Sequence, residues 1–510
     1  MELIAERKSG KIYKAEPWCF YEVKIPSLSE KEKDLVSLIS KATLEEVSPS
    51  DLAILFIENK QRASFVEKVR DLLSQLGPYY DRLLEEKEES KAIKMVGEFV
   101  TKVAPFVTHK EQVIYSIIKN LIGLGRLSYL LDDDELEEIM TNGAKQPVFV
   151  FDRTYGLCKT SISFDDDRDI IAIINRVAKF TSKKVSKELP LLEARLPDGS
   201  RINATIPPAS PKGPTLTIRK FRKRPFTITD IVKNNTMSSE VAAFLWMCVD
   251  GLHSIPRNIV VAGSTGSGKT TTLNALIVFV PQRERIVTIE DTLELNLHGR
   301  ENWIQLEARP GIYEAPLTMD DLLKNTIRMR PDRIIVGEVR GSEAETMFVA
   351  MDIGHQGVMS TIHSNSARES LLRLQSAPMN VPKSMFTLLD LIVMQHRMYV
   401  PKMGTIRRVT QLAEVSVMDE HVLLNDIYMR DRNKDEVIRT EIPSQTIETF
   451  AFYTGMTKME IQEELLSRQL VIDFLVDNNI TEVSDIQKIV TAYQSNPKGV
   501  LDKIESKRVT

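Results

Sequence analysis

Residues 258–276 read NIVVAGSTGSGKTTTLNAL, and this stretch decides the fold of the middle of the chain. An apolar run leads into a loop of small residues and then into a helical pattern, which is the strand, loop and helix context of a phosphate-binding loop. The spacing Gly263-x-x-x-x-Gly268-Lys269-Thr270 matches that loop. A surface turn would account for the glycines, but it would not account for a lysine and a threonine at the start of a helix.

Each residue type in this loop has a physical task. Glycines let consecutive backbone amides face one concavity, the lysine neutralises charge on the β- and γ-phosphates, and the threonine hydroxyl can ligate Mg²⁺. We therefore expect ATP to bind here with Mg²⁺, and Thr270 to be a metal ligand. The expected ATP-binding residues of the loop are Gly263, Ser264, Thr265, Gly266, Ser267, Gly268, Lys269, Thr270 and Thr271.

A second apolar run, in RIVTIEDTLEL (285–295), delivers three carboxylates into a short stretch: Glu290, Asp291 and Glu294. Like charges this close repel each other unless a cation or a proton-demanding task offsets the repulsion. Phosphoryl transfer supplies both, because Mg²⁺ needs acceptors and the attacking water must be positioned. We expect all three to serve catalysis; a solvated acidic turn is the alternative.

Two later apolar runs also end in polar residues. In RIIVGEVRG (333–341), Glu338 stands at the strand tip and is an expected catalytic acid and metal ligand, although the position usually held by aspartate is Gly337. In GHQGVMSTIHSN (354–365), His363 closes a strand at the edge where open parallel sheets bind ligands. We expect His363 to sense the γ-phosphate. A helix-capping acid and a structural histidine are the respective alternatives.

The rest of the chain divides by pattern. Helical spacing covers residues 27–120, and YLLDDDELEEIM predicts one more helix from residue 129, before a hairpin. Alternating β-branched and helical runs over 237–400 indicate βαβ units with a mainly parallel sheet. The expected organisation is an N-terminal helical region (1–128), a small α+β domain (129–218), a basic linker (219–236) with five Lys and Arg residues between positions 219 and 224, and an α/β domain with C-terminal strands and helices (237–510).

Composition limits the partners and the cellular location that we expect for this chain. The chain has 42% apolar and 27% charged residues and a net charge of −4, so no global basic field favours nucleic acid. Cys19, Cys158 and Cys248 stand too far apart for a metal knuckle, which favours a reducing, cytoplasmic setting. The longest apolar runs fall far short of the roughly 18 residues of a membrane span. We expect a cytoplasmic protein held at the inner face of the cell membrane by a partner.

The four motifs, in this order, resemble those of the type II/type IV secretion ATPase superfamily. They are GSTGSGKTTT, TIEDTLEL, RPDRIIVGEVRGSEA and GHQGVMSTIHSNS, and RLPDGSRINATIPP with TIRKF resembles the end of that family's N-terminal domain. The resemblance covers roughly residues 129–415. Three scattered cysteines cannot build the four-cysteine zinc insertion of many bacterial members, which favours archaeal members or the retraction and conjugation types. The chain as a whole resembles archaellum (archaeal flagellum) motor ATPases, and archaeal adhesive pilus ATPases would share nearly all these motifs.

The resemblance implies a homohexameric ring with RecA-like cores, in which ATP binds between two domains and drives filament assembly or rotation through a polytopic membrane platform protein. Other archaellum motor components and membrane lipid are further implied partners. By position, Glu294 matches the catalytic base, Glu338 the Walker B acid and His363 the His-box residue. Three arginines, Arg195, Arg201 and Arg219, occupy positions that reach phosphates, although a solubility role is the alternative.

Two other functions remain open at this point. A RecA-like core could move single-stranded nucleic acid, but such channels combine basic grooves with stacking aromatics, and aromatics make up only 6% of this chain. A regulatory or structural nucleotide-binding ring would hydrolyse slowly or not at all, as Gly337 would allow.

Overall fold

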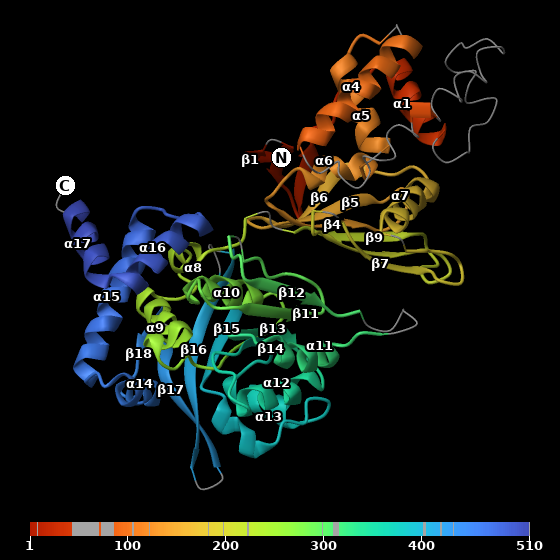
Figure 1. Cartoon of the computed structure of the whole chain (residues 1–510). Helices are drawn as coiled ribbons and strands as arrows, with labels where there is room; N and C mark the ends of the chain where they lie inside the picture. Colours follow the sequence, from red (N-terminus) through yellow and green to blue (C-terminus); the bar gives the residue numbers. More distant parts are fainter. Residues whose placement is uncertain are drawn as a thin grey trace. The chain divides into compact units, whose positions relative to one another are not determined.

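The computed structural model describes residues 1–7, 9–42, 71–72, 86–104, 107–121, 123–181, 183–196, 198–221, 224–297, 299–309, 316–400, 404–418, 421–431 and 433–508. The chain forms two compact units, residues 1–223 and 224–510. Within the described residues, each unit contains its own sheet of nine strands (Figure 1). Among the described helices, none combines the length and the apolar composition that crossing a bilayer requires.

The sheet of the first unit is largely antiparallel, in the order β1-β2-β3-β6-β5-β4-β9-β8-β7, and only β3 and β6 pair in parallel. Its strands are β1 (Glu2–Arg7), β2 (Gly10–Lys14), β3 (Cys19–Val23), β4 (Leu136–Thr141), β5 (Pro147–Asp152), β6 (Gly156–Ser163), β7 (Leu191–Arg195), β8 (Arg201–Thr205) and β9 (Thr215–Arg219).

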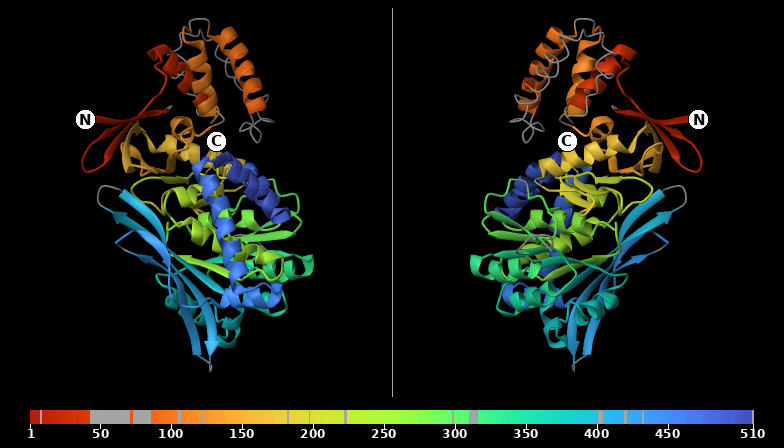
Figure 2. Two further views of the ribbon diagram at one scale, coloured as in Figure 1. Left: turned by 90° about the vertical axis from the view of Figure 1, so that its left-hand side faces the viewer. Right: turned by 90° about the vertical axis from the view of Figure 1, so that its right-hand side faces the viewer.

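Helices of the first unit are α1 (Glu30–Ala42), α4 (Glu86–Val103), α5 (Lys110–Leu121), α6 (Ser128–Leu131) and α7 (Asp167–Phe180). Helix α7 covers one face of the sheet, because Ile170, Ile174 and Val177 are buried with the apolar residues of β7, β8 and β9. Helices α1 and α4 both pack on α5 (Figure 2). The parts of the predicted helical region at residues 43–70 and 73–85 lie outside the described residues.

Two predictions for this unit are wrong. The N-terminal region is not helical throughout, because residues 2–23 form β1, β2 and β3; Ile12, Tyr21 and Val23 are buried and alternate with polar neighbours, which is the period of a strand. The helix predicted from residue 129 ends at Leu131, and Leu136–Thr141 is β4 instead, paired with β5 and β9.

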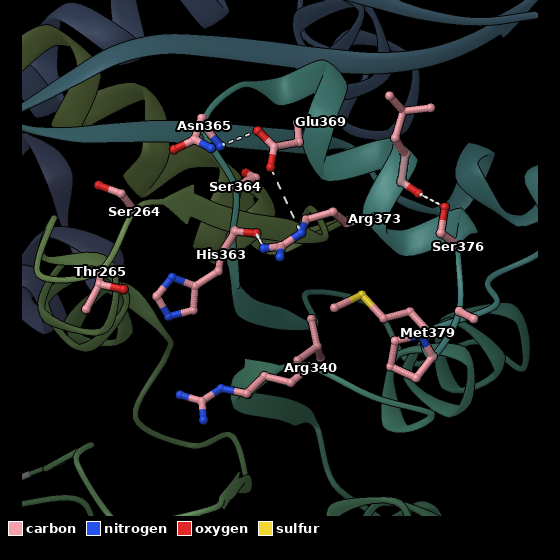
Figure 3. Close-up of a pocket in the computed structure, with 14 residues that line it drawn as sticks. Ser264, Thr265, Arg340, His363, Ser364, Asn365, Glu369, Arg373, Ser376 and Met379 are labelled. Atoms are coloured by element: carbon pink, nitrogen blue, oxygen red, sulfur yellow. Dashed lines mark hydrogen bonds and ion pairs between the residues drawn. The ribbon is translucent and has the colours of Figure 1, made fainter.

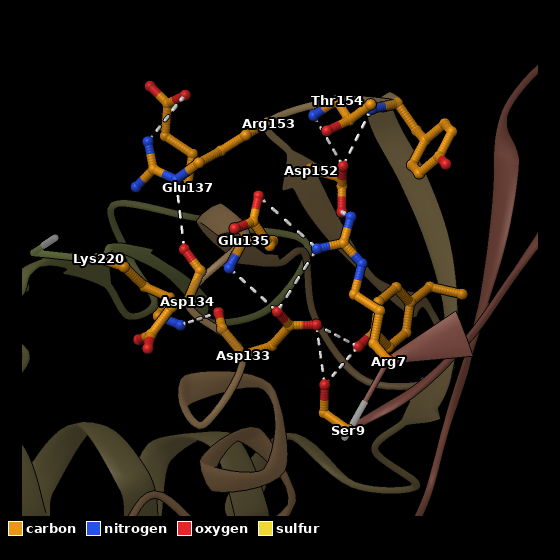
Figure 4. Close-up of polar contacts among 12 residues, drawn as sticks. Arg7, Ser9, Asp133, Asp134, Glu135, Glu137, Asp152, Arg153, Thr154 and Lys220 are labelled. Atoms are coloured by element: carbon orange, nitrogen blue, oxygen red, sulfur yellow. Dashed lines mark hydrogen bonds and ion pairs between the residues drawn. The ribbon is translucent and has the colours of Figure 1, made fainter. Parts of the chain in front are cut away.

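Buried ion pairs anchor these first strands. The Arg7 guanidinium on β1 donates to the fully buried Asp152 at 2.7 Å and lies 3.8 Å from Asp133 (Figure 4). Tyr21 also donates to Asp133 at 2.5 Å. Contacts of this kind between residues far apart in sequence explain why helical spacing alone did not reveal the strands.

The second unit has the order β12-β11-β13-β14-β10-β15-β16-β17-β18. The strands from β12 to β15 pair in parallel, and β16, β17 and β18 extend the sheet in antiparallel fashion. The strands are β10 (Ile259–Gly263), β11 (Ile286–Glu290), β12 (Trp303–Glu307), β13 (Arg333–Val339), β14 (Met359–His363), β15 (Leu391–Val400), β16 (Gly404–Met418), β17 (His421–Asp431) and β18 (Glu436–Arg439).

Helices cover both faces of this sheet. Along β10, Ile259 and Val261 join the core beneath α9, whereas Val260 and Ala262 join the core beneath α12, as expected for a parallel strand buried on both sides. The C-terminal helices pack on the α9 side (Figure 2). The helices are α8 (Ile228–Lys233), α9 (Ser239–Asp250), α10 (Lys269–Leu276), α11 (Met319–Thr326), α12 (Glu343–Asp352), α13 (Ala367–Gln375), α14 (Gln445–Thr454), α15 (Lys458–Asp477), α16 (Val483–Ser495) and α17 (Pro497–Arg508).

This arrangement confirms the predicted fold class: a RecA-like α/β core with a mainly parallel sheet, preceded by a helical block and a small α+β part, and followed by strands and helices. The boundary between the two units falls within the predicted linker. The ends of that linker are regular, since Arg219 closes β9 and α8 begins at Ile228.

Candidate functional site

The phosphate-binding loop connects β10 to α10 as predicted. Gly266 and Gly268 have φ values of 71° and 96°, a region that favours glycine. A Cβ at Gly263 would lie 2.1 Å from the Gln395 carbonyl oxygen, so this position has room for glycine alone. Thr270 and Thr271 follow, half-buried, in the first turn of α10.

Strands β15 and β16 support this loop with residues that sequence reasoning missed. Gln395 pairs in register with Gly263, and its side chain accepts a hydrogen bond from Thr272 at 2.7 Å. Arg407 donates to the Gly266 carbonyl oxygen at 2.9 Å. No motif marks these residues; their only signal is their place in the strands that follow the His-box motif.

A chain of polar contacts leads from the loop to the neighbouring strand ends. Lys269 Nζ lies 3.3 Å from His363 Nδ1, and His363 Nε2 lies 2.8 Å from Glu338 Oε1. Arg340 then donates to Glu338 Oε2 at 2.5 Å. The contacts connect the ends of β10, β14 and β13, so the structure brings together three of the predicted site residues.

Electrostatics fix the direction of the hydrogen bonds in this chain. Burial lowers the pKa of His363, while the negative charge of Glu338 opposes the shift. A neutral imidazole with its proton on Nε2 accepts from Lys269 through Nδ1 and points its N–H group toward Glu338 Oε1, which accepts no hydrogen bond. Burial also lowers the pKa of Lys269, which is 7% exposed, and the charges of Glu338 and Glu294 oppose that shift.

Glu290 lies behind these residues at the end of β11. It is 2% exposed, its Oε1 accepts the backbone N–H groups of Glu294 and Leu295 at 2.7 and 2.9 Å, and burial raises its pKa to about 7. A Cβ at Gly337 would lie 2.9 Å from Glu290 Cγ. The missing aspartate at position 337 is therefore explained: the Glu290 side chain fills the space that a side chain there would need.

The other two acids of this segment lie closer to the surface. Asp291 is exposed and its Oδ2 lies 4.0 Å from Arg340 Nη1. Glu294 is half-buried, and its charge acts on both Lys269 and Arg340. Because β11 and β13 are neighbours, all four predicted carboxylates occupy one edge of the sheet.

An open pocket of about 820 Å³ adjoins the contact chain (Figure 3). Its wall includes Ser264 and Thr265 of the loop, and Arg340, His363 and Arg373 beyond it. Arg373 donates to the His363 carbonyl oxygen and so fixes the backbone at the end of β14. The pocket gives solvent and solutes access to the side of the loop where Glu338 and His363 lie.

The predicted arginines lie in the first unit, on three adjacent strands. Arg195, Arg201 and Arg219 are in register across β7, β8 and β9. The neighbours of these arginines along the strands, Ala194, Ile202 and Ile218, are buried. Because successive side chains of a strand point to opposite faces, the three arginines share the other face of the sheet. Like charges directly opposite each other destabilise a sheet, and an anion on this face would offset the repulsion.

The loop residues fit a magnesium-bound triphosphate. The Ser267 hydroxyl is buried without a hydrogen-bond partner, and so is Glu290 Oε2. Thr270 and Glu338 carry oxygen atoms of the kind that Mg²⁺ takes as ligands when phosphates supply others, and these two residues would hold the metal. Among the described residues, no three His, Cys, Asp or Glu side chains gather into a separate metal cluster.

Comparison with known proteins places the chain in a family. The family model described as "Type II/IV secretion system protein" matches residues 122–463 of the 510. An uncharacterized Methanocaldococcus jannaschii protein, MJ0900, is 30% identical over 466 residues, 86% of this chain and 83% of that protein. Another, MJ0781, is 46% identical over 259 residues, 50% of this chain but 35% of that protein, so this chain spans about a third of that relative.

Other similar proteins include the conjugal transfer protein TrbB of Rhizobium radiobacter, 35% identical over 49% of this chain and 74% of that protein. Among solved structures, VirB11 of the Brucella suis type IV secretion system is 28% identical over 56% of this chain and 91% of that chain, with a TM-score of 0.29. The pilus retraction motor PilT is 20% identical over 66% and 88%, with a TM-score of 0.40. The residue assignments therefore rest on the geometry of this chain. With the family model covering more than half of its length, the chain belongs to the type II/IV secretion system protein family, the superfamily of ATPases that its four ordered motifs predicted.

Proposed function

We propose that this chain is a Mg²⁺-dependent ATPase that works as a homohexameric motor. The observation that carries the proposal is the contact chain from Lys269 through His363 and Glu338 to Arg340, at the carboxyl edge of the sheet. A nucleotide regulator needs the loop alone. It has no need for acids and a histidine arranged beside it.

Each residue has a role in this proposal. The loop amides and Lys269 bind the β- and γ-phosphates, and Thr270 and Glu338 hold the metal, which when bound neutralises charge on the phosphates. Glu294 orients and deprotonates the attacking water, while Glu290 and Asp291 shape the acidic surroundings. His363 donates a hydrogen bond from its Nε2–H group to an acceptor beside the γ-phosphate. Rate enhancement comes from positioning and charge stabilisation.

In the proposed motor, the domain that carries the arginine row is the part that moves. Arg195, Arg201 and Arg219 reach the phosphates of the same or a neighbouring subunit, and the basic linker lets their domain close on nucleotide and reopen after hydrolysis. In this proposal the protein is cytoplasmic, lies at the inner face of the membrane with possible lipid contact, and acts on a polytopic platform protein.

We propose the archaellum, with its other motor components, as the load, since the wording of RLPDGSRINATIPP and GHQGVMSTIHSN favours it. A type IV pilus or secretion machine is the second candidate, which the names of TrbB and of the type IV secretion protein PtlH of Bordetella pertussis favour. Co-purification with a platform protein and the filament or channel subunits of one system decides between them. Stimulation by single-stranded DNA, but not by archaeal-type lipid, would support nucleic acid as the load instead.

The catalytic proposal is tested with Glu338→Gln. The variant should bind ATP as the parent does, yet lower turnover by at least about 100-fold, because loss of a metal and charge-stabilising group affects the transition state most. Glu345→Gln, an exposed acid on α12, is the matched control and should keep parental turnover. Parental turnover in Glu338→Gln would refute the assignment.

A further inference from the structure

The Arg340 guanidinium contacts the carboxylate of Glu338, which the proposed reaction needs as a metal ligand. Its Nη2 donates to Glu338 Oε2 at 2.5 Å, while Glu338 Oε1 contacts His363 Nε2 at 2.8 Å. Glu338 is 19% exposed, so little of the carboxylate remains open to further ligands. Oε2 of the proposed metal ligand is thus engaged by Arg340, whereas Oε1 lies near His363 but accepts no hydrogen bond.

We propose that Arg340 is a positioning residue that competes with the magnesium-bound triphosphate for Glu338. The inference rests on the proposed function, because it concerns the same carboxylate. A cation can take Glu338 Oε2 as a ligand only when the guanidinium leaves it, since two positive charges cannot share one oxygen at contact distance without strong repulsion. Arg340 therefore makes metal binding at Glu338 weaker than the carboxylate alone would allow.

The backbone around Arg340 is held by hydrogen bonds, while most of its side chain is exposed. The backbone N–H groups of Arg340 and Gly341 donate to Glu343 Oε1 at 2.5 and 2.7 Å, and Glu343 is 8% exposed. The Arg340 side chain, by contrast, is 63% exposed. A long side chain on a fixed backbone can exchange partners without disturbing β13 or α12.

The surroundings offer the guanidinium an alternative place. Arg340 lines the pocket of about 820 Å³, which has room for the side chain once it leaves Glu338. Its Nη1 already lies 4.0 Å from Asp291 Oδ2, so a second carboxylate remains within reach. The triphosphate supplies further negative charge, so we expect displacement to be favourable with nucleotide present and unfavourable for the metal alone.

Binding of a fluorescent, non-hydrolysable ATP analogue tests this competition apart from turnover. For each variant, the dissociation constant is measured in excess EDTA and in excess Mg²⁺. The value in EDTA divided by the value in Mg²⁺ gives the contribution of the metal to binding. We expect Arg340→Gln to raise this ratio by about fivefold, because one partly exposed ion pair no longer opposes the metal. Arg340→Lys keeps the positive charge but loses the planar guanidinium group. Its ratio should therefore fall between those of the parent and of Arg340→Gln.

Arg368→Gln is the matched control, since Arg368 is an exposed arginine of α13, and it should give the parental ratio. An unchanged or lowered ratio in Arg340→Gln would overturn the competition, and a lowered ratio would assign Arg340 to phosphate binding. If Arg340→Gln loses analogue binding in EDTA through misfolding, Arg340→Lys decides by the same criterion. Failure of the parent to bind the analogue at all would instead refute the proposed function.

Discussion

The nucleotide cradle of the second unit and the arginine row of the first unit treat charge in opposite ways. In the cradle, Lys269, Glu338 and Arg340 alternate in sign along one chain of contacts. In the row, Arg195, Arg201 and Arg219 stand side by side with the same sign. The first arrangement alternates positive and negative side chains, whereas the second places three arginines next to one another in register, with Glu138 in register with Arg219 at the end of the row.

This difference indicates how the two regions divide the proposed task. A cluster in which opposite charges contact one another can hold its geometry on its own, which chemistry requires. Neighbouring arginines on one sheet face present several cationic groups to an anion, which suits a surface that closes on a phosphate ligand and then releases it.

Lys269→Ala should have the largest effect. Removing the only cation of the loop should lower turnover by about 10³-fold, because nothing replaces its charge on the β- and γ-phosphates. Phosphate release under saturating ATP measures this. Lys458→Ala, an exposed lysine paired with Glu448 on the C-terminal helices, is the control and should retain turnover. A fully active Lys269→Ala protein would show that the cradle is not the site of hydrolysis.

Glu290 should make the stability of the cradle depend on pH. Burial raises its pKa from 4.5 to about 7 in the folded protein. Between these values the folded state keeps a proton that the unfolded state releases, so the free energy of unfolding falls as pH rises and levels off above 7. Glu290→Gln should lack this fall and gain about 3 kcal/mol relative to the parent between pH 4.5 and 8.

Denaturant titrations of both proteins across this pH range measure the effect on the second unit. Parallel curves for parent and variant would mean that Glu290 is ionised in the folded state, and that the buried cluster carries one more negative charge than this account allows.

Arg201→Gln tests the row at its centre. We expect about a tenfold weaker affinity for the ATP analogue, since one charge-assisted contact to phosphate is lost. Arg168→Gln, an exposed arginine at the start of α7, is the matched control. Equal affinities for parent and Arg201→Gln would leave the row with a solubility role.

Much of the fold and of the cradle could be predicted from sequence because local patterns determine them. The loop between β10 and α10 depends on glycines and a lysine at fixed spacing, and the buried parallel strands are continuous apolar runs. Glu338 and His363 were predictable because each directly ends such a run. The order of the four motifs along the chain was the basis of the family resemblance.

What the sequence did not reveal depends on pairing between distant segments. Gln395 and Arg407 support the loop only because β15 lies beside β10 and β16 beside β15. Gly337 looked like a defect until the Glu290 side chain was found in its place. The strands β1, β2 and β3 pair with one another, and only β3 pairs with a distant strand, β6, more than 130 positions away, so the place of this hairpin pair in the sheet has no local sequence signal.

The central claim is that Lys269 and the carboxylates at the ends of β11 and β13 act together on one magnesium-bound triphosphate. An experimental structure with Mg²⁺ and a non-hydrolysable ATP analogue tests it most directly. The account predicts that Lys269 Nζ leaves His363 for the β- and γ-phosphates, with Glu338 at the metal and Glu294 facing the γ-phosphate. A bound analogue with Lys269 turned away from the phosphates, or with Glu294 and Glu338 remote from them, would contradict it.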